Sequence, residues 1–151
     1  KAFYVAHKDA ITGDIMENYL AYSFNEEQLL KEIKNPDFEY HVLYYKGKLV
    51  GYSKVILNTK NENIKEKNVT KMERLYLSEE YHGLGLGKQL FDFNINLIKE
   101  NNQIGTWLYV WIKNDKALKF YKKTGFKNIA DYDFPVSETE TRPNYVMFLS
   151  L

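Results

Sequence analysis

Three alternating glycines between a predicted strand and a predicted helix constrain this chain more than any other feature. The segment reads Arg74-Leu75-Tyr76-Leu77-Ser78-Glu79-Glu80-Tyr81-His82-Gly83-Leu84-Gly85-Leu86-Gly87-Lys88. Because glycine lacks a Cβ, Gly83, Gly85 and Gly87 can adopt angles closed to other residues and let a ligand approach the main chain. Apolar residues then recur at helical spacing, at Leu86, Leu90, Phe93 and Leu97. The loop therefore opens a helix, whose unpaired amides and positive dipole end predict a site for an anion such as pyrophosphate.

Two other classes of nucleotide-binding loop do not fit this spacing. An NTPase phosphate loop needs four residues before its Gly-Lys pair, then Ser or Thr. Here only three residues separate Gly83 from Gly87, and Gln89 follows Lys88. A dinucleotide fingerprint needs an acidic residue at the end of the next strand, and the matching segment, Thr106-Trp107-Leu108-Tyr109, has none. A tight strand-to-helix connection without a ligand stays open as the alternative.

A second informative segment begins about twenty residues after the glycines. The run Thr106–Ile112 is apolar on both faces, which predicts an interior strand covered on both sides. Asn114 is expected to be the N-cap of a helix over Asp115–Lys123, and Gly125 is its natural C-terminal stop. We expect Ala117, Leu118 and Tyr121 to share the buried face of that helix.

The two segments together resemble the GNAT acyl-CoA N-acetyltransferases. The loop pattern of that family, Q/R-x-x-G-x-G/A, maps onto His82 through Gly87, with His82 in place of the usual Gln or Arg. The other matching features are Asn114 and the run Ala117-Leu118-Lys119-Phe120-Tyr121-Lys122-Lys123-Thr124-Gly125-Phe126. The combination is more specific than either half, and the resemblance covers roughly Tyr40–Ser150.

The resemblance implies a fold, a cosubstrate and binding residues. The fold is the α+β GNAT fold, a mixed, mostly antiparallel central sheet with helices on both faces, as a single acetyltransferase domain over residues 1–151. The cosubstrate is acetyl-CoA, whose amide-bearing arm a strand edge can bind as another strand would. The residues expected to bind it are Leu75, Tyr76, Leu77, His82, Gly83, Leu84, Gly85, Leu86, Gly87, Lys88, Asn114, Ala117 and Tyr121. Ala21–Leu29 and Trp107–Asn114 are also similar to bacterial PaiA-type spermidine/spermine acetyltransferases.

Two side chains are candidates for catalysis. Tyr121 is the candidate general acid, since a phenol with a pKa of about 10 stays protonated at neutral pH and can donate to a leaving thiolate. Its alternative role is that of a core tyrosine. Glu73 is the candidate base for a protonated amine and is expected to share a strand face with Leu75 and Leu77. The alternative for Glu73 is a surface ion pair with a lysine such as Lys71, and the alternative for Asn114 is helix capping alone.

Bulk properties narrow the classes of function. The absence of cysteine rules out a cysteine nucleophile and favours direct attack by the amine. The net charge of +1 gives no global field for nucleic acid, and no apolar run approaches the length of a membrane span. We therefore expect a cytoplasmic enzyme with a small-molecule amine as partner, with neither nucleic acid nor membrane, and with a homodimer left open. Because Lys1 is not a methionine, a preceding strand and helix start are expected to be missing.

The remaining elements follow from periodicity and turn residues. Helices are expected at Ile15–Tyr22 and at Glu26–Lys34, the second with Asn25 as N-cap and Asn35-Pro36 as stop. Strands are expected at Tyr40–Tyr45, Leu49–Leu57, Lys71–Leu77, Phe126–Asp133 and Tyr145–Leu149, with the long helix over Gly85–Asn101. The expected connections are a turn at Lys46-Gly47-Lys48, a loop at Asn58–Asn68 and a mobile loop at Ser137–Pro143.

The resulting hypothesis is an acetyl-CoA-dependent N-acetyltransferase that acts on a small amine, with a polyamine as the candidate acceptor. Aromatic and acidic residues that could line a slot for a cation are Glu17, Tyr19, Tyr22, Phe24, Glu26 and Glu27. Two alternatives stay open: a protein or peptide N-acetyltransferase, and a non-catalytic acyl-CoA-binding regulator.

Overall fold

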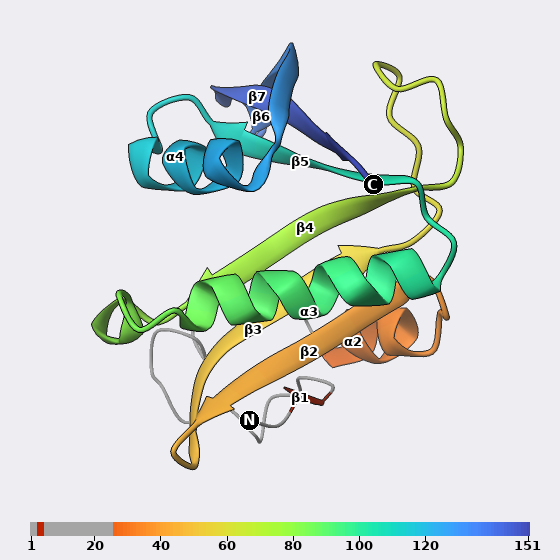
Figure 1. Cartoon of the computed structure of the whole chain (residues 1–151). Coiled ribbons are helices and arrows are strands. Elements are labelled where there is room, and N and C mark those ends of the chain that lie inside the picture. Colours follow the sequence, from red (N-terminus) through yellow and green to blue (C-terminus); the bar gives the residue numbers. More distant parts are fainter. Residues whose placement is uncertain (1–2, 5–25) are drawn as a thin grey trace. The chain divides into compact units, whose positions relative to one another are not determined.

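The structure is a computed structural model that describes residues 3–4 and 26–151. The helix expected at Ile15–Tyr22 and the N-cap expected at Asn25 lie outside the described residues. The elements, labelled in Figure 1, are β1 (Phe3–Tyr4), α2 (Glu26–Ile33), β2 (Phe38–Tyr45), β3 (Lys48–Ile56), β4 (Val69–Leu77), the 3-10 helix η2 (Glu79–Tyr81), α3 (Leu86–Glu100), β5 (Gly105–Trp111), α4 (Asp115–Thr124), β6 (Lys127–Pro135) and β7 (Thr141–Ser150). Apart from β1 and η2, which were not predicted, these elements confirm the predicted ones to within a few residues.

Contacts group the chain into two compact units. The first comprises Lys1–Leu57 and Glu73–Leu97, and the second comprises Asn58–Met72 and Ile98–Leu151. Strand β4 begins in the second unit and ends in the first. That the whole chain is a single domain stays a prediction.

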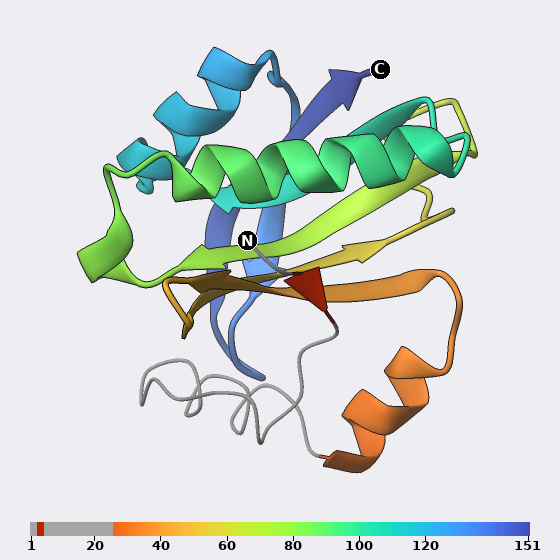
Figure 2. The same ribbon diagram turned by 60° about the horizontal axis from the view of Figure 1, so that its bottom comes forward.

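In the first unit, strands follow the order β1-β2-β3-β4 and carry a helix on each face. Figure 2 shows α2 and α3 on opposite sides of β2 and β3. On the α2 side, Ile33 packs against a cluster built on Tyr40, Val42, Leu49 and Tyr52. On the α3 side, Leu86 and Leu90 pack against Leu43 and Val50. The alternation of β2 side chains thus supplies both layers of the core.

The β2–β3 hairpin is set by its turn and by a bulge. Lys46 and Gly47 both have positive φ, 50° and 80°, which is the two-residue type I′ turn that matches strand twist. Tyr44 pairs with Leu49 and Leu43 with Gly51, so Val50 is an extra residue on β3. The bulge explains why Leu49 and Tyr52 face α2 although three positions separate them.

In the second unit, the strand order is β4-β5-β7-β6. Val69–Lys71 pair in parallel with Gly105–Trp107, whereas β7 pairs antiparallel with both β5 and β6. Strand β5 is therefore an interior strand, as predicted. Together with the antiparallel pairs β1–β2 and β2–β3, this arrangement confirms the α+β fold class with its mixed, mostly antiparallel sheet.

The loop predicted over Ser137–Pro143 is shorter than expected. Strand β7 already begins at Thr141, and Pro143 lies opposite Asp133 on β6. The hydroxyl of Ser137 accepts hydrogen bonds from the amides of Thr139 and Glu140 at 3.3 and 3.0 Å, which closes a tight turn. The prediction was wrong because ladder bonds are made by the backbone, so polar residues and one proline do not end a strand.

Candidate functional site

The glycine loop joins the end of β4 to the start of α3 in the first unit. Gly83 and Gly85 have φ values of 86° and 77°, in the left-handed region that favours glycine. Gly87 lies in the first turn of α3 without a positive φ, so the expected special conformation holds for two of the three glycines. A Cβ built at Gly83 or Gly85 would meet no atom within 4 Å. The main chain at both positions therefore borders open space that a ligand can enter.

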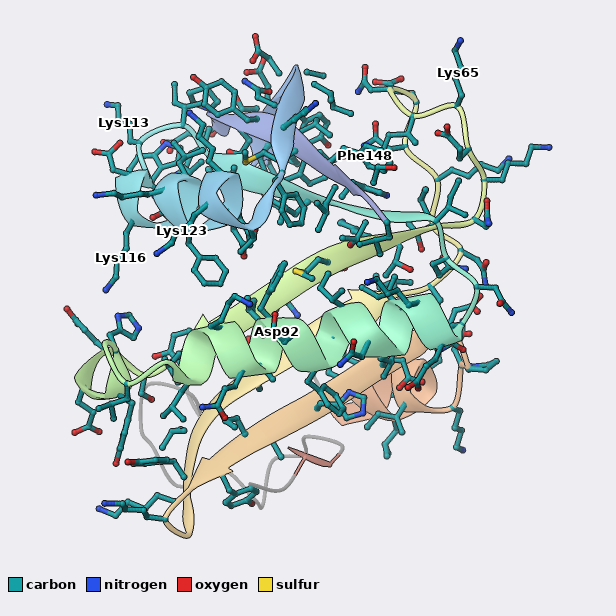
Figure 3. The ribbon with its side chains drawn as sticks, in the orientation of Figure 1. Lys65, Asp92, Lys113, Lys116, Lys123 and Phe148 are labelled. Atoms are coloured by element: carbon teal, nitrogen blue, oxygen red, sulfur yellow. The ribbon has the colours of Figure 1, made fainter. Side chains whose placement is uncertain are left out.

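The amides at the start of α3 give the loop its positive potential. Gln89 donates to the carbonyl of Gly85 at 3.1 Å, so the preceding amides, those of Leu86, Gly87 and Lys88, lie before the first intrahelical bond. The Lys88 ammonium lies 2.7 and 2.8 Å from the carboxylate oxygens of Asp92, which Figure 3 labels on α3. Because Asp92 neutralises this lysine, attraction for an anion comes chiefly from the backbone.

His82 and Leu84 shape the outer side of the loop. The imidazole of His82 donates from Nε2 to the carbonyl of Leu77 at 2.9 Å, which ties the loop back to the end of β4. Leu84, between the two left-handed glycines, is 53% exposed and so does not belong to the core. Both residues were predicted to bind the cofactor, and both lie beside the open space at Gly83 and Gly85.

The end of β4 is held from both faces. Leu75 and Leu77 pack with the α3 cluster, whereas the ring of Tyr76 lies 5.9 Å from that of Tyr52 on the other face. A Cβ at Gly51 of β3 would stand 2.6 Å from the carbonyl oxygen of Tyr76, so only glycine permits this approach of the two strands. Since β4 is the last strand of the first unit, Leu75–Leu77 form its outer edge.

Glu73 belongs to an ionic cluster, built around the buried ammonium of Lys54, that the sequence did not reveal. The ammonium of Lys54, on β3, lies 3.2 Å from Oε1 of Glu73 and 2.8 Å from Oε1 of Glu32, on α2. The guanidinium Nη2 of Arg74 lies 3.8 Å from the same Glu73 oxygen. Lys71, the partner expected for Glu73, instead places its ammonium over the rings of Trp107 and Tyr109. An ion pair with a lysine is therefore present, but the lysine is the buried Lys54 and the pair does not lie on the surface as expected.

The cluster lies on the α2 side of the sheet. The Lys54 ammonium is 5.2 Å from the ring centroids of both Phe38 and Tyr40, and the Tyr40 hydroxyl donates to Oε1 of Glu32. Burial, and then the bond to Glu32, raise the pKa of Tyr40 above its usual value. The Glu73 carboxylate contacts Lys54 on this side, whereas Leu75 and Leu77 pack with the α3 cluster, so the expectation that the three share a face is wrong. A lysine within the apolar run Leu49–Leu57 was the signal that could have indicated a buried, paired charge.

In the second unit, α4 carries the other predicted binding residues. Oδ1 of Asn114 accepts from the amide of Ala117 at 3.2 Å, which confirms Asn114 as the N-cap. Gly125, with φ of 108°, ends the helix as predicted. Tyr121 lies seven positions after Asn114, so the two lie on the same side of the helix roughly 10 Å apart along its axis. The capping bond uses Oδ1 and leaves the Nδ2 group of Asn114 as the donor for a ligand.

Tyr121 is packed among aromatic rings. Its ring lies 5.4 Å from that of Phe120 and 5.3 Å from that of Phe126, both edge to face. Burial raises the pKa of Tyr121 to about 12. The phenol is therefore protonated at neutral pH, as a general acid must be, although the same packing suits a structural tyrosine.

Exposed lysines surround α4. Figure 3 labels Lys113, Lys116 and Lys123 along this helix, and the exposed lysines of this segment are Lys113, Lys116, Lys119, Lys122 and Lys123. Asp115 is the one acidic residue among them. The helix thus presents a positive potential to an anionic ligand.

The predicted slot for a cation falls largely outside the described residues, which is true of Glu17, Tyr19, Tyr22 and Phe24. Glu27 lies on α2 and is exposed. Over residues 3–4 and 26–151, no group of three or more acidic, histidine or cysteine side chains could hold a metal ion. In that same part of the chain, no helix has the length and apolar character needed to cross a membrane.

Comparisons with known proteins show which proteins this chain resembles. The family model described as "Acetyltransferase (GNAT) family" matches residues 8–126. An uncharacterized N-acetyltransferase in the pepI 3′ region of Lactobacillus delbrueckii subsp. lactis is 32% identical over 82% of this chain and 71% of its own length. The spermine/spermidine N(1)-acetyltransferase of Bacillus subtilis is 26% identical over 80% of each chain. The PaiA N-acetyltransferase of Thermoplasma acidophilum, solved with coenzyme A, superposes with a TM-score of 0.66 and 23% identity over 95% of this chain and 82% of its own.

Proposed function

Because the chain belongs to the Acetyltransferase (GNAT) family, we propose that it transfers the acetyl group of acetyl-CoA to a primary amine of a small molecule. The observation that carries this proposal is the pair of left-handed glycines, Gly83 and Gly85, that border open space directly before α3. A side chain at either position would fill the space through which a pyrophosphate reaches the backbone amides.

The binding roles follow from the geometry of each unit. Acetyl-CoA supplies the activated acetyl group. The amides at the start of α3 bind its pyrophosphate, and the outer edge of Leu75–Leu77 pairs with its amide-bearing arm. In the second unit, Asn114 offers its Nδ2 as a donor to the cofactor, and Ala117 is proposed as a further contact on α4. The lysines around α4 favour the negative charge of the nucleotide portion.

The chemical roles fall to Glu73 and Tyr121. Glu73 removes a proton from the ammonium of the substrate, directly or through water, because the amine attacks only when neutral. A backbone amide of Leu75–Leu77 polarises the carbonyl under attack. Tyr121 then protonates the departing thiolate. Attack is direct, since the sequence contains no cysteine to carry the acetyl group.

The acceptor we propose is a polyamine. Support comes from the spermine/spermidine N(1)-acetyltransferase of Bacillus subtilis, which matches most of this chain. A cytoplasmic location and a homodimer stay predictions, as does the absence of nucleic acid among the partners.

The test is release of free thiol from acetyl-CoA by the purified protein with spermidine, spermine, lysine and a peptide amine as acceptors. Turnover with the polyamines alone supports the proposal. Turnover with the peptide alone would make the chain a peptide N-acetyltransferase. Binding of acetyl-CoA without thiol release from any acceptor would contradict catalysis and favour a regulator.

A further inference from the structure

The ionic cluster around Glu73 points to a second residue on which its chemistry depends. We propose that Lys54 is a positioning residue that fixes the carboxylate of Glu73 for proton transfer. This inference rests on the proposed function, in which Glu73 is the base. It concerns a residue of β3, outside the glycine loop.

The first support is burial combined with contact. Lys54 is 3% exposed, and its ammonium contacts the Glu73 carboxylate at 3.2 Å. A buried ammonium is stable only when it is paired and hydrogen-bonded. The burial of Lys54 therefore depends on contacts such as the one with Glu73. The neighbouring Arg74 is both more exposed, at 19%, and more distant, at 3.8 Å. Of these two cations, Lys54 is the closer to the Glu73 carboxylate and the more buried.

The second support is that Lys54 is itself fixed from the other side. Its ammonium contacts Glu32 at 2.8 Å, and Glu32 in turn accepts a hydrogen bond from the Tyr40 hydroxyl. The rings of Phe38 and Tyr40 flank the same ammonium. Residues of α2, β2 and β3 thus hold the ammonium in place, so a shift of the Glu73 side chain would break its contact with Lys54 rather than carry the lysine along.

Among residues 26–151, the charged groups seen in contact are the carboxylates of Glu32 and Glu73, the ammonium of Lys54 and the guanidinium of Arg74. Removal of Lys54 takes away the ammonium that contacts both carboxylates, so the Glu73 side chain loses its contact at 3.2 Å. Small misplacements of a catalytic group reduce rate steeply.

The test is a kinetic cycle on the full chain with an acceptor that the wild type acetylates. The variants are K54M, K54R, E73Q and K54M/E73Q. We expect K54M to lower kcat at least about 10-fold while the KM for acetyl-CoA changes less than about twofold, and K54R to recover most of the loss. Because Lys54 acts through Glu73, K54M/E73Q should be no slower than E73Q. Multiplied losses in the double variant, or an unchanged kcat in K54M, would overturn the inference.

A second comparison guards against a variant that fails to fold. The K54M change leaves the buried Glu32 carboxylate without its ammonium, which can destabilise the fold. The E32Q change removes that charge, so the kcat of E32Q/K54M is compared with the kcat of E32Q. The same drop in kcat between E32Q and E32Q/K54M supports the inference, and no drop contradicts it. If the wild type itself acetylates no acceptor, the proposed function fails. If the wild type is active and the losses multiply, only the role of Lys54 fails.

Discussion

Substitution of Gly83 or Gly85 by alanine tests whether the glycine loop binds a ligand or only connects β4 to α3. A Cβ at Gly85, where φ is 77°, would have no neighbouring atom within 4 Å, and the same holds for Gly47, with φ of 80°, in the β2–β3 turn. Gly47→Ala is therefore a matched control for Gly85→Ala. Both variants force alanine into the left-handed region, which destabilises the fold by about 1–2 kcal/mol.

The two variants should differ in cofactor binding. At Gly85 the new methyl group fills the space through which the phosphate reaches the amides at the start of α3, and a hydrogen bond to a charged group contributes about 1.5–3 kcal/mol. Loss of one such bond weakens acetyl-CoA binding by roughly 10- to 150-fold, given that about 1.4 kcal/mol is tenfold in affinity. Gly47→Ala should leave the dissociation constant unchanged. Gly83→Ala, at φ of 86°, should behave like Gly85→Ala.

Titration calorimetry with coenzyme A measures the affinity, and urea denaturation of the same samples measures stability. The expected result is an equal loss of stability in Gly47→Ala and Gly85→Ala with weaker binding in the second alone. Wild-type affinity in Gly85→Ala would mean that the loop is only a strand-to-helix connection. Equal weakening in both variants would mean that binding reports stability rather than contact with the loop.

Three further outcomes are expected from the described geometry. Tyr121→Phe should lower kcat by about 10²-fold with unchanged coenzyme A affinity, whereas unchanged turnover would leave Tyr121 a structural residue. Burial raises the pKa of Tyr121 to about 12, from about 10 in the unfolded chain. The folded state therefore holds the phenol proton more tightly, and the free energy of unfolding falls by up to about 3 kcal/mol as the pH rises from about 10 to about 12. This loss should be absent in Tyr121→Phe when unfolding is followed by denaturant titration at each pH. Lys54→Met should lower the free energy of unfolding by about 3–5 kcal/mol because it strands a buried charge, and a loss under 1 kcal/mol would contradict the burial of the cluster.

Local signals in the sequence predicted most elements correctly. The turn predicted at Lys46-Gly47-Lys48, the cap at Asn114 and the stop at Gly125 each depend on the backbone preference of one or two residues. Such preferences act over a few positions, so they can be recognised without knowledge of the partner segments. The glycine loop belongs to the same class, because Gly83 and Gly85 report their own backbone conformation.

The role of Gly51 could not be predicted in the same way. Its backbone angles are ordinary, and what requires glycine there is the carbonyl of Tyr76, 2.6 Å from where a Cβ would stand. Strand-to-strand proximity depends on register, and the register of β3 is shifted by the bulge at Val50. A short apolar strand carries no signal for such a shift.

The ion pair of Glu73 could not be predicted either, because its partner lies far away in the sequence. The observed pair also bears on whether Glu73 can act as a base. From the sequence, an ion pair and a catalytic base were alternative roles for Glu73. A surface ion pair with a lysine such as Lys71 would have accounted for the carboxylate without any role in catalysis. The observed partner, Lys54, is buried and is also held by Glu32, two residues that lie 19 and 41 positions before Glu73 in the sequence. An ion pair this constrained does not compete with a role as base, because it fixes one oxygen of the carboxylate and so restricts the direction from which a proton can be taken. The ion pair then serves the base, and kinetics in the E73Q variant test this. If the pair is only structural, adding K54M to E73Q lowers kcat further. If the pair acts through the Glu73 carboxylate, adding K54M to E73Q leaves kcat unchanged.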